Sequence, residues 1–140
     1  MSYSPATRPT FYFIGVTTGQ SSIMKVFPAW AEYLGLGDVE IKGIDFPAHD
    51  MPENYREVVN FLKNDPLSLG ALVTTHKLDL FQACKDMFDV IDATLMAETS
   101  CISKRDGQLI CKAKDPISSG LSLDGFLPED HFANTGAELF

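Results

Sequence analysis

The stretch Gly70-Ala-Leu-Val-Thr-Thr-His-Lys77 decides how this chain is interpreted, because it joins a buried strand to a helix. A short apolar run ends in two threonines, and apolar residues at helical spacing follow the lysine. Lys77 therefore lies where a helix begins, and helix N-termini carry partial positive charge. The charged form of a lysine is disfavoured there, which would let the amine exchange protons near neutral pH. The alternative is a side chain that bends into solvent and has no chemical role.

Strand and helix signals alternate on both sides of this stretch. Aromatic and β-branched runs indicate strands, and apolar residues repeated every three or four positions indicate helices. The expected strands span 11–16, 39–45 and 69–73, and the expected helices span 23–34, 52–64 and 77–84. This order predicts a parallel sheet with helices on both faces. The loops 17–22, 46–51 and 74–77 should then meet at the carboxyl edge of the sheet, where ligands bind.

The second half of the chain has the pattern of a β-hairpin. Two short runs, 98–103 and 108–112, flank an Asp106-Gly107 pair, which is a strong hairpin signal. The chain then passes through Asp115-Pro116 into a short amphipathic stretch. The whole sequence predicts an α/β three-layer sandwich: a mostly parallel sheet, helices on both faces, and a C-terminal β-hairpin that adds antiparallel strands.

Composition and charge exclude several classes of protein. The 140 residues are 45% hydrophobic and 21% charged, as in a globular domain with its own core. The net charge of −8 without a basic cluster argues against a nucleic-acid partner. No apolar run reaches bilayer length, and the first ten residues lack the core of a secretory signal, so no membrane partner is expected. Three cysteines without metal-type spacing favour free thiols and a cytoplasmic location.

Four segments, in this order and spacing, resemble the N-terminal substrate-binding domain of shikimate and quinate dehydrogenases. The loop Gly15–Ser21 is similar to the family's glycine-to-serine substrate loop. Val73-Thr-Thr-His-Lys77 resembles its Asn-Val-Thr-x-Pro-x-Lys segment. Ala97–Ile102 resembles its Gly-Ala-Val-Asn-Thr strand, and Cys111-Lys-Ala-Lys-Asp115 resembles its Gly-x-Asn-Thr-Asp motif.

The resemblance implies that Lys77 and Asp115 are the catalytic pair. The implied reaction interconverts a ring hydroxyl and a ketone, of the shikimate/3-dehydroshikimate type, with NADP or NAD as cofactor. Lys77 would accept or return the hydroxyl proton, and Asp115 would orient Lys77 and hydrogen-bond the same hydroxyl. The alternative role of Asp115 is to cap the helix that Pro116 opens.

Four hydroxyl side chains are the expected substrate-binding residues: Ser21, Thr74, Thr75 and Ser100. Each can instead cap a helix or bond locally to the backbone, as serine and threonine routinely do. Thr75 is expected mainly as the N-cap of the helix that begins near Lys77.

Several positions depart from the family pattern. The family's second loop serine aligns with Ile23, its asparagine before the lysine with Ala71, its hairpin asparagine with Ser100, and its asparagine before the aspartate with Ala113. Each lost hydrogen bond to a polar ligand group would cost ~1–3 kcal/mol. We therefore expect a small ring substrate that differs from shikimate or is less polar.

The resemblance also implies a division of the chain into three parts. Residues 1–10 would be a flexible N-terminus, 11–127 the substrate-binding domain, and 128–140 a linker to a nucleotide-binding domain. This sequence contains no Gly-x-Gly-x-x-Gly fingerprint, so no cofactor-binding residue is expected in it. The expected partners are a small polar ring substrate and the missing C-terminal domain, and a homodimer is left open. The rival hypothesis is a non-catalytic small-molecule-binding or protein-interaction module on the same fold.

Other residues that carry possible chemistry have simpler explanations. His49 and Asp50 are too few ligands for a zinc site, so no metal is expected. His76 is expected to be packed or solvated. Phe27 and Trp30 follow the apolar spacing of their helix and are expected in the core.

Overall fold

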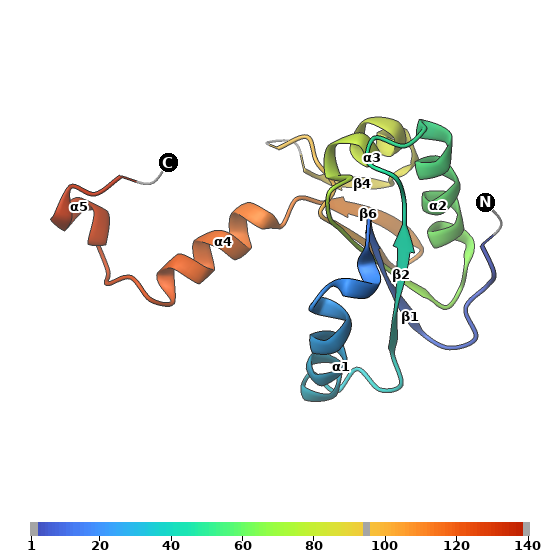
Figure 1. The fold of residues 1–140 in the computed structure, drawn as a ribbon, viewed down its shortest axis with the longest axis horizontal. Helices are drawn as coiled ribbons and strands as arrows, with labels where there is room; N and C mark the ends of the chain where they lie inside the picture. The colour runs from blue at the N-terminus through green and yellow to red at the C-terminus, as the bar shows by residue number, and fades with distance from the viewer. Residues whose placement is uncertain (1–2, 94–95, 139–140) are drawn as a thin grey trace.

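The chain folds around a six-stranded sheet, as a computed structural model describes for residues 3–93 and 96–138 (Figure 1). The strand order is β2-β1-β3-β5-β6-β4. The elements are β1 (Thr10–Gly15), a 3-10 helix η1 (Thr18–Gln20), α1 (Ile23–Tyr33), β2 (Glu40–Asp45), α2 (Pro52–Asn64), β3 (Ser68–Val73), α3 (Lys77–Cys84), a 3-10 helix η2 (Lys85–Met87), β4 (Val90–Asp92), β5 (Cys101–Arg105), β6 (Gln108–Lys112), α4 (Asp115–Asp124) and α5 (His131–Thr135). The expected α/β class is confirmed.

The sheet consists of a parallel half and a hairpin half that meet at β3 and β5. β1 pairs in parallel with both β2 and β3, while β3 pairs with β5 in antiparallel register from Gly70↔Ser103 to Leu72↔Cys101. The hairpin of β5 and β6 turns at Asp106-Gly107, as the sequence predicts. β4, which lies parallel to β6, was not predicted. Its three residues are all exposed, so they lack the alternation that identifies a strand from sequence.

Helices cover both faces of the sheet. The main core lies between the sheet and the pair α2 and α3, and includes Tyr55, Leu62 and Leu80, each 1% exposed or less. Because successive strand residues point to opposite faces, Tyr12 faces this core whereas Phe11 faces α1. There Phe11 stacks on Phe27 with ring centroids 5.3 Å apart. The result is the expected three-layer arrangement.

The apolar face of α1 is only partly covered by the described parts of the chain. Ala31 is the buried residue of this helix, whereas Trp30 is 56% exposed. The prediction that Trp30 lies in the core was therefore wrong, while Phe27 is half-buried against Phe11. Helical spacing identifies an apolar face, but it does not say what packs against that face.

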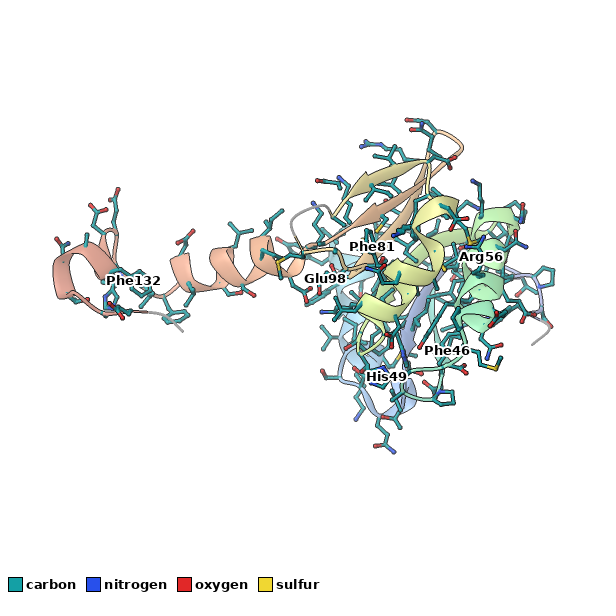
Figure 2. All side chains as sticks on the ribbon, turned by 90° about the horizontal axis from the view of Figure 1, so that it is seen from above. Phe46, His49, Arg56, Phe81, Glu98 and Phe132 are labelled. Atoms are coloured by element: carbon teal, nitrogen blue, oxygen red, sulfur yellow. The ribbon has the colours of Figure 1, made fainter. Side chains whose placement is uncertain are left out.

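The two ends of the chain differ in how they contact the sheet. β1 begins at Thr10, one residue before the expected start of the domain. In the segment expected to be flexible, the Ala6 amide donates to Asp65 Oδ2 at 2.8 Å, and Arg8 pairs with Asp38 and Glu40. At the other end, α4 and α5 extend away from the sheet, with Phe132 far from it in Figure 2. Residues 1–2 and 139–140, which belong to the expected N-terminus and linker, lie outside the described residues.

Within residues 3–93 and 96–138, no helix has the length and apolar character needed to cross a bilayer.

Replacement of Gly70 tests the junction of the two halves of the sheet. Gly70 has a φ of +121°, and a Cβ there would lie 2.1 Å from the Ile102 carbonyl oxygen of β5. We expect Gly70→Ala to lower the free energy of unfolding in urea by at least ~2 kcal/mol, since both backbone strain and a steric clash oppose the side chain. Gly120→Ala on α4 is the control, because its Cβ meets nothing within 4 Å. Equal stability of the two variants would contradict this account.

The Glu40 carboxylate predicts an acid-sensitive contact between the N-terminal segment and β2. Hydrogen bonds from Lys42 and Arg8 lower its pKa to about 2. A folded-state pKa below the unfolded one stabilises the fold above about pH 4.5, and that stabilisation disappears as the pH falls towards 2. Glu40→Gln should therefore be less stable than the wild type at pH 7, by less than ~1 kcal/mol for so exposed a network, and equally stable near pH 2. Urea unfolding at several pH values measures this, with Glu129→Gln as the control.

Candidate functional site

A pocket of about 250 Å³ lies at the carboxyl ends of β1 and β3. Its walls come from the loop that contains η1 and from the loop between β3 and α3. Ser21, Thr74 and Thr75, three of the four expected substrate-binding residues, line it together with Gln20 and Phe13. The two loops meet as the topology predicts, because ligand sites in such sheets lie beyond the carboxyl ends of the strands.

The η1 loop is held in place by Thr18, a residue that the sequence analysis did not single out. Its amide donates to Asp45 Oδ1 at 2.8 Å, and its side chain is 4% exposed. The side chain fills the space above Gly15 and Gly43, where added Cβ atoms would lie within 3.1 Å and 2.0 Å of it. A glycine inside a strand pattern signals such a close approach, so Gly43 was a usable sign in the sequence.

The loop between β3 and α3 is fixed by His76 rather than by Thr75. His76 is fully buried, and its Nδ1 lies 2.9 Å from Tyr55 Oη with the Phe46 ring beside it. α3 begins at Lys77, and its N-cap is His76 without a side-chain capping bond. The prediction of Thr75 as the N-cap was therefore wrong, because Thr75 adopts a φ of +58° and lines the pocket instead. Of the two alternatives expected for His76, packed or solvated, the structure shows the packed one.

Lys77 and Asp115 are brought together although they are 38 residues apart in sequence. Lys77 Nζ donates to Asp115 Oδ2, and the two side chains are 24% and 49% exposed. Each is the first residue of its helix, so the pair lies between the N-termini of α3 and α4. An ammonium group beside a carboxylate can hold a proton, donate it to an oxygen and take it back. Neither residue lines the pocket, which approaches the pair at Thr75, two residues before Lys77.

Ser100, the fourth expected substrate-binding residue, is not placed at the pocket. Its side chain is 1% exposed, accepts a hydrogen bond from the Lys114 amide at 2.7 Å, and lies 3.2 Å from the Lys112 carbonyl oxygen. The structure thus separates three groups. The pocket holds Ser21, Thr74 and Thr75, the ion pair lies beside it, and Ser100 bonds to the backbone that leads to Asp115.

The loop after β2, expected at the same edge, forms a second pocket instead. His49, labelled in Figure 2, places its Nδ1 2.9 Å from Asp79 Oδ2 on α3. A cavity of about 470 Å³ is lined by both residues. The Asp50 carboxylate accepts hydrogen bonds from the Met51 amide and from the Asn54 side chain. Across the described ranges, no three histidine, cysteine or acidic side chains are grouped to hold a metal ion.

The three cysteines are buried or half-buried free thiols. Burial raises the pKa of Cys84 to about 12, and it raises the pKa of Cys101 and of Cys111 as well. The thiolate, which is the reactive form, is therefore disfavoured at all three positions. Nucleophilic thiol chemistry is not the chemistry of this site.

The fold of this chain is similar to part of several solved shikimate dehydrogenases. The chain shares 18% identity with the enzyme from Aquifex aeolicus, covering 91% of this chain and 45% of that one, with a TM-score of 0.69. With the Thermus thermophilus enzyme solved with NADP(H) and shikimate it shares 19% identity, over 85% of this chain and 43% of that one, with a TM-score of 0.65. With a 5-ketofructose reductase from Gluconobacter sp. strain CHM43 it shares 20% identity, over 85% of this chain and 40% of that one, with a TM-score of 0.67.

These similarities establish the fold and show that it matches only part of each similar protein. The chain spans less than half the length of each of these three proteins. No family model matches the sequence, and no curated protein matches it.

Replacement of Gly43 tests the packing that shapes the pocket. A Cβ on this residue would lie 2.0 Å from Thr18 Oγ1, and the buried Thr18 has no room to retreat. We expect Gly43→Ala to displace η1 and to shift the backbone amide NMR signals of Thr18 and Ser21. Gly19→Ala, in η1 itself, is the matched control, since its Cβ meets nothing within 4 Å. Unchanged signals in Gly43→Ala would show that Thr18 does not set the loop position.

Proposed function

We propose that this chain is the substrate-binding and catalytic part of an oxidoreductase that interconverts a ring hydroxyl and a ketone. The observation that carries the proposal is the ion pair of Lys77 and Asp115 beside a pocket lined by hydroxyl groups. The fold shared with shikimate dehydrogenases and a ketofructose reductase supports the same class of reaction.

In this reaction Lys77 handles the proton of the reacting oxygen. When the hydroxyl is oxidised, the neutral amine takes its proton, and in the reverse direction the ammonium group returns the proton to the ketone oxygen. The Asp115 carboxylate holds Lys77 in place by a charge-assisted hydrogen bond. General acid–base assistance of this kind is worth roughly 10²–10⁴ in rate.

The second substrate would be NAD or NADP, which some of the similar structures contain. The residues of this chain do not fit it, because the loop after β1 reads Gly-Val-Thr-Thr-Gly-Gln-Ser and lacks the glycine spacing of a dinucleotide site. We therefore assign the cofactor to a nucleotide-binding domain outside this chain, and we assign to this chain only the proton transfer and the substrate contacts.

The pocket favours a small hydroxylated substrate without a strongly charged group. Its side chains include the hydroxyls of Ser21, Thr74 and Thr75 and the amide of Gln20, all of them neutral hydrogen-bonding groups. The phenyl ring of Phe13 adds an apolar wall suited to the face of a ring. Because Ile23 replaces a family serine, fewer donors are available for a carboxylate than shikimate dehydrogenases of the usual pattern provide.

A non-catalytic binding or interaction module is the second candidate. It is favoured by the apolar side chains that α1 and α4 expose, among them Trp30, Tyr33 and Leu121 at 56%, 89% and 66%. Such surfaces are common where proteins associate. Under this alternative, the ion pair would have no effect on small-molecule binding.

Ligand titration of two variants separates the candidates. We expect 5-ketofructose to shift the NMR signals of Ser21, Thr74 and Thr75, and the carboxylates shikimate and quinate to shift them only at higher concentration. Lys77→Ala and Asp115→Ala should each weaken that binding at least roughly tenfold, because a hydrogen bond to a charged group contributes ~1.5–3 kcal/mol. Lys85→Ala, an exposed lysine in η2, is the control for loss of one positive charge. Binding that is unaffected by both substitutions would favour the interaction module.

A further inference from the structure

Asp115 is held in place almost entirely by the backbone at the start of α4. None of the described α4 side chains is buried, and the helix extends away from the sheet in both views (Figures 1 and 2). Packing of α4 therefore does not fix the direction of the Asp115 side chain. The geometry of the ion pair depends on the short segment that leads from β6 into the helix.

Ser100 is the residue that anchors this segment. Its hydroxyl accepts a hydrogen bond from the Lys114 amide at 2.7 Å and donates to the Lys112 carbonyl at 3.2 Å, while its own amide donates to the same carbonyl at 3.1 Å. Lys114 is the N-cap of α4, and its carbonyl accepts the Ser118 amide in the first turn. One buried side chain thus fixes the residue immediately before Asp115.

The neighbouring residue reaches the other member of the pair. The Thr99 amide donates to the Lys77 carbonyl at 3.0 Å, and the Ser100 carbonyl accepts the Val73 amide at 3.0 Å. Thr99 and Ser100 are 0% and 1% exposed. Two consecutive buried residues therefore connect the backbone of Lys77 to the backbone before Asp115, and they set the separation of the two side chains.

We propose that Ser100 is a positioning residue for the Lys77–Asp115 pair and not a substrate ligand. The consequence of this positioning for catalysis rests on the proposed function. The positioning itself concerns only the geometry of the ion pair. A serine hydroxyl has one donor and two acceptor sites, and here the donor and one acceptor site are already used. Its burial removes the remaining acceptor site from contact with a solute in the pocket.

Loss of the hydroxyl should release the start of α4. Without it the Lys114 amide loses its partner, and two backbone bonds are left to hold the segment: Ser100 amide to Lys112 carbonyl at 3.1 Å and Ala113 amide to Asp92 carbonyl at 3.2 Å. The carboxylate then moves away from Lys77, and the Lys77 amine, released from its hydrogen bond, becomes more accessible to a reagent.

The experiment measures how fast Lys77 reacts in the intact chain without any substrate. Limited reductive methylation, quantified by peptide mass spectrometry, gives the rate at Lys77 relative to the exposed Lys25 in the same molecule. We expect Ser100→Ala to raise this ratio roughly two- to fivefold, as Asp115→Asn does, since a partly exposed ion pair has a coupling of that size. Ser100→Thr should restore the wild-type ratio, and Ser122→Ala on α4 should leave it unchanged.

A second pair of variants tests the same hydrogen bond from its donor side and leaves the buried Ser100 unchanged. Lys114→Pro deletes the amide donor, whereas Lys114→Ala deletes only the exposed side chain, so only the proline variant should raise the ratio. These two decide the question if Ser100→Ala does not fold, as judged by circular dichroism. A folded Ser100→Ala and a Lys114→Pro that both keep the wild-type ratio would overturn the proposal. Failure of every substrate to bind would overturn the proposed function and leave this result standing.

Discussion

The antiparallel pairing of β3 with β5 is the constraint on which the rest of this molecule depends. It joins a parallel half, which carries the pocket and Lys77, to a hairpin half, which carries Asp115. The two strands meet backbone to backbone at Gly70, where the Ile102 carbonyl occupies the place of a side chain. The same pairing continues to the bond between the Val73 amide and the Ser100 carbonyl, just before the site begins. Lys77 and Asp115, which are 38 positions apart in sequence, are thereby brought together.

The electrostatics of the site follow from where the two helices start. Asp115 lies at the N-terminus of α4, where the helix dipole favours a negative charge. Lys77 lies at the equivalent end of α3, where a positive charge is disfavoured. The carboxylate and the acidic Asp79 in the first turn of α3 oppose that unfavourable placement. The two opposite charges therefore lie side by side at the N-termini of two helices.

The fold could be predicted from the sequence because its signals are local, whereas the site depends in part on packing that is not. Pro52 marked the start of α2, Asp106-Gly107 marked the hairpin, and the order of elements implied the sheet. The approach of Lys77 to Asp115 was implied by the resemblance to shikimate and quinate dehydrogenases. β4 was missed because its pairing with β6 supplies a stability that three exposed residues do not encode. Thr75 and Ser100 were assigned by residue type, but their positions are set by His76 inside the core and by the backbone at Lys114. Hydroxyl residues bond locally or to ligands with equal ease, so burial decides between the two.

The junction at Asp115 also connects the site to anything that contacts α4. The helix begins at the carboxylate, exposes Ile117 and Leu121, and contributes no buried side chain to the sheet. Apolar residues on a projecting helix are stabilised when another surface covers them. A protein surface that packs against α4 would set the direction of the helix, and the ion pair and the hydrogen bonds at residues 112–114 resist its rotation. The position of the Asp115 carboxylate relative to Lys77 is therefore coupled to the orientation of α4. Anchoring by Ser100 limits that coupling, because it fixes the residue before Asp115 to the sheet and not to the helix.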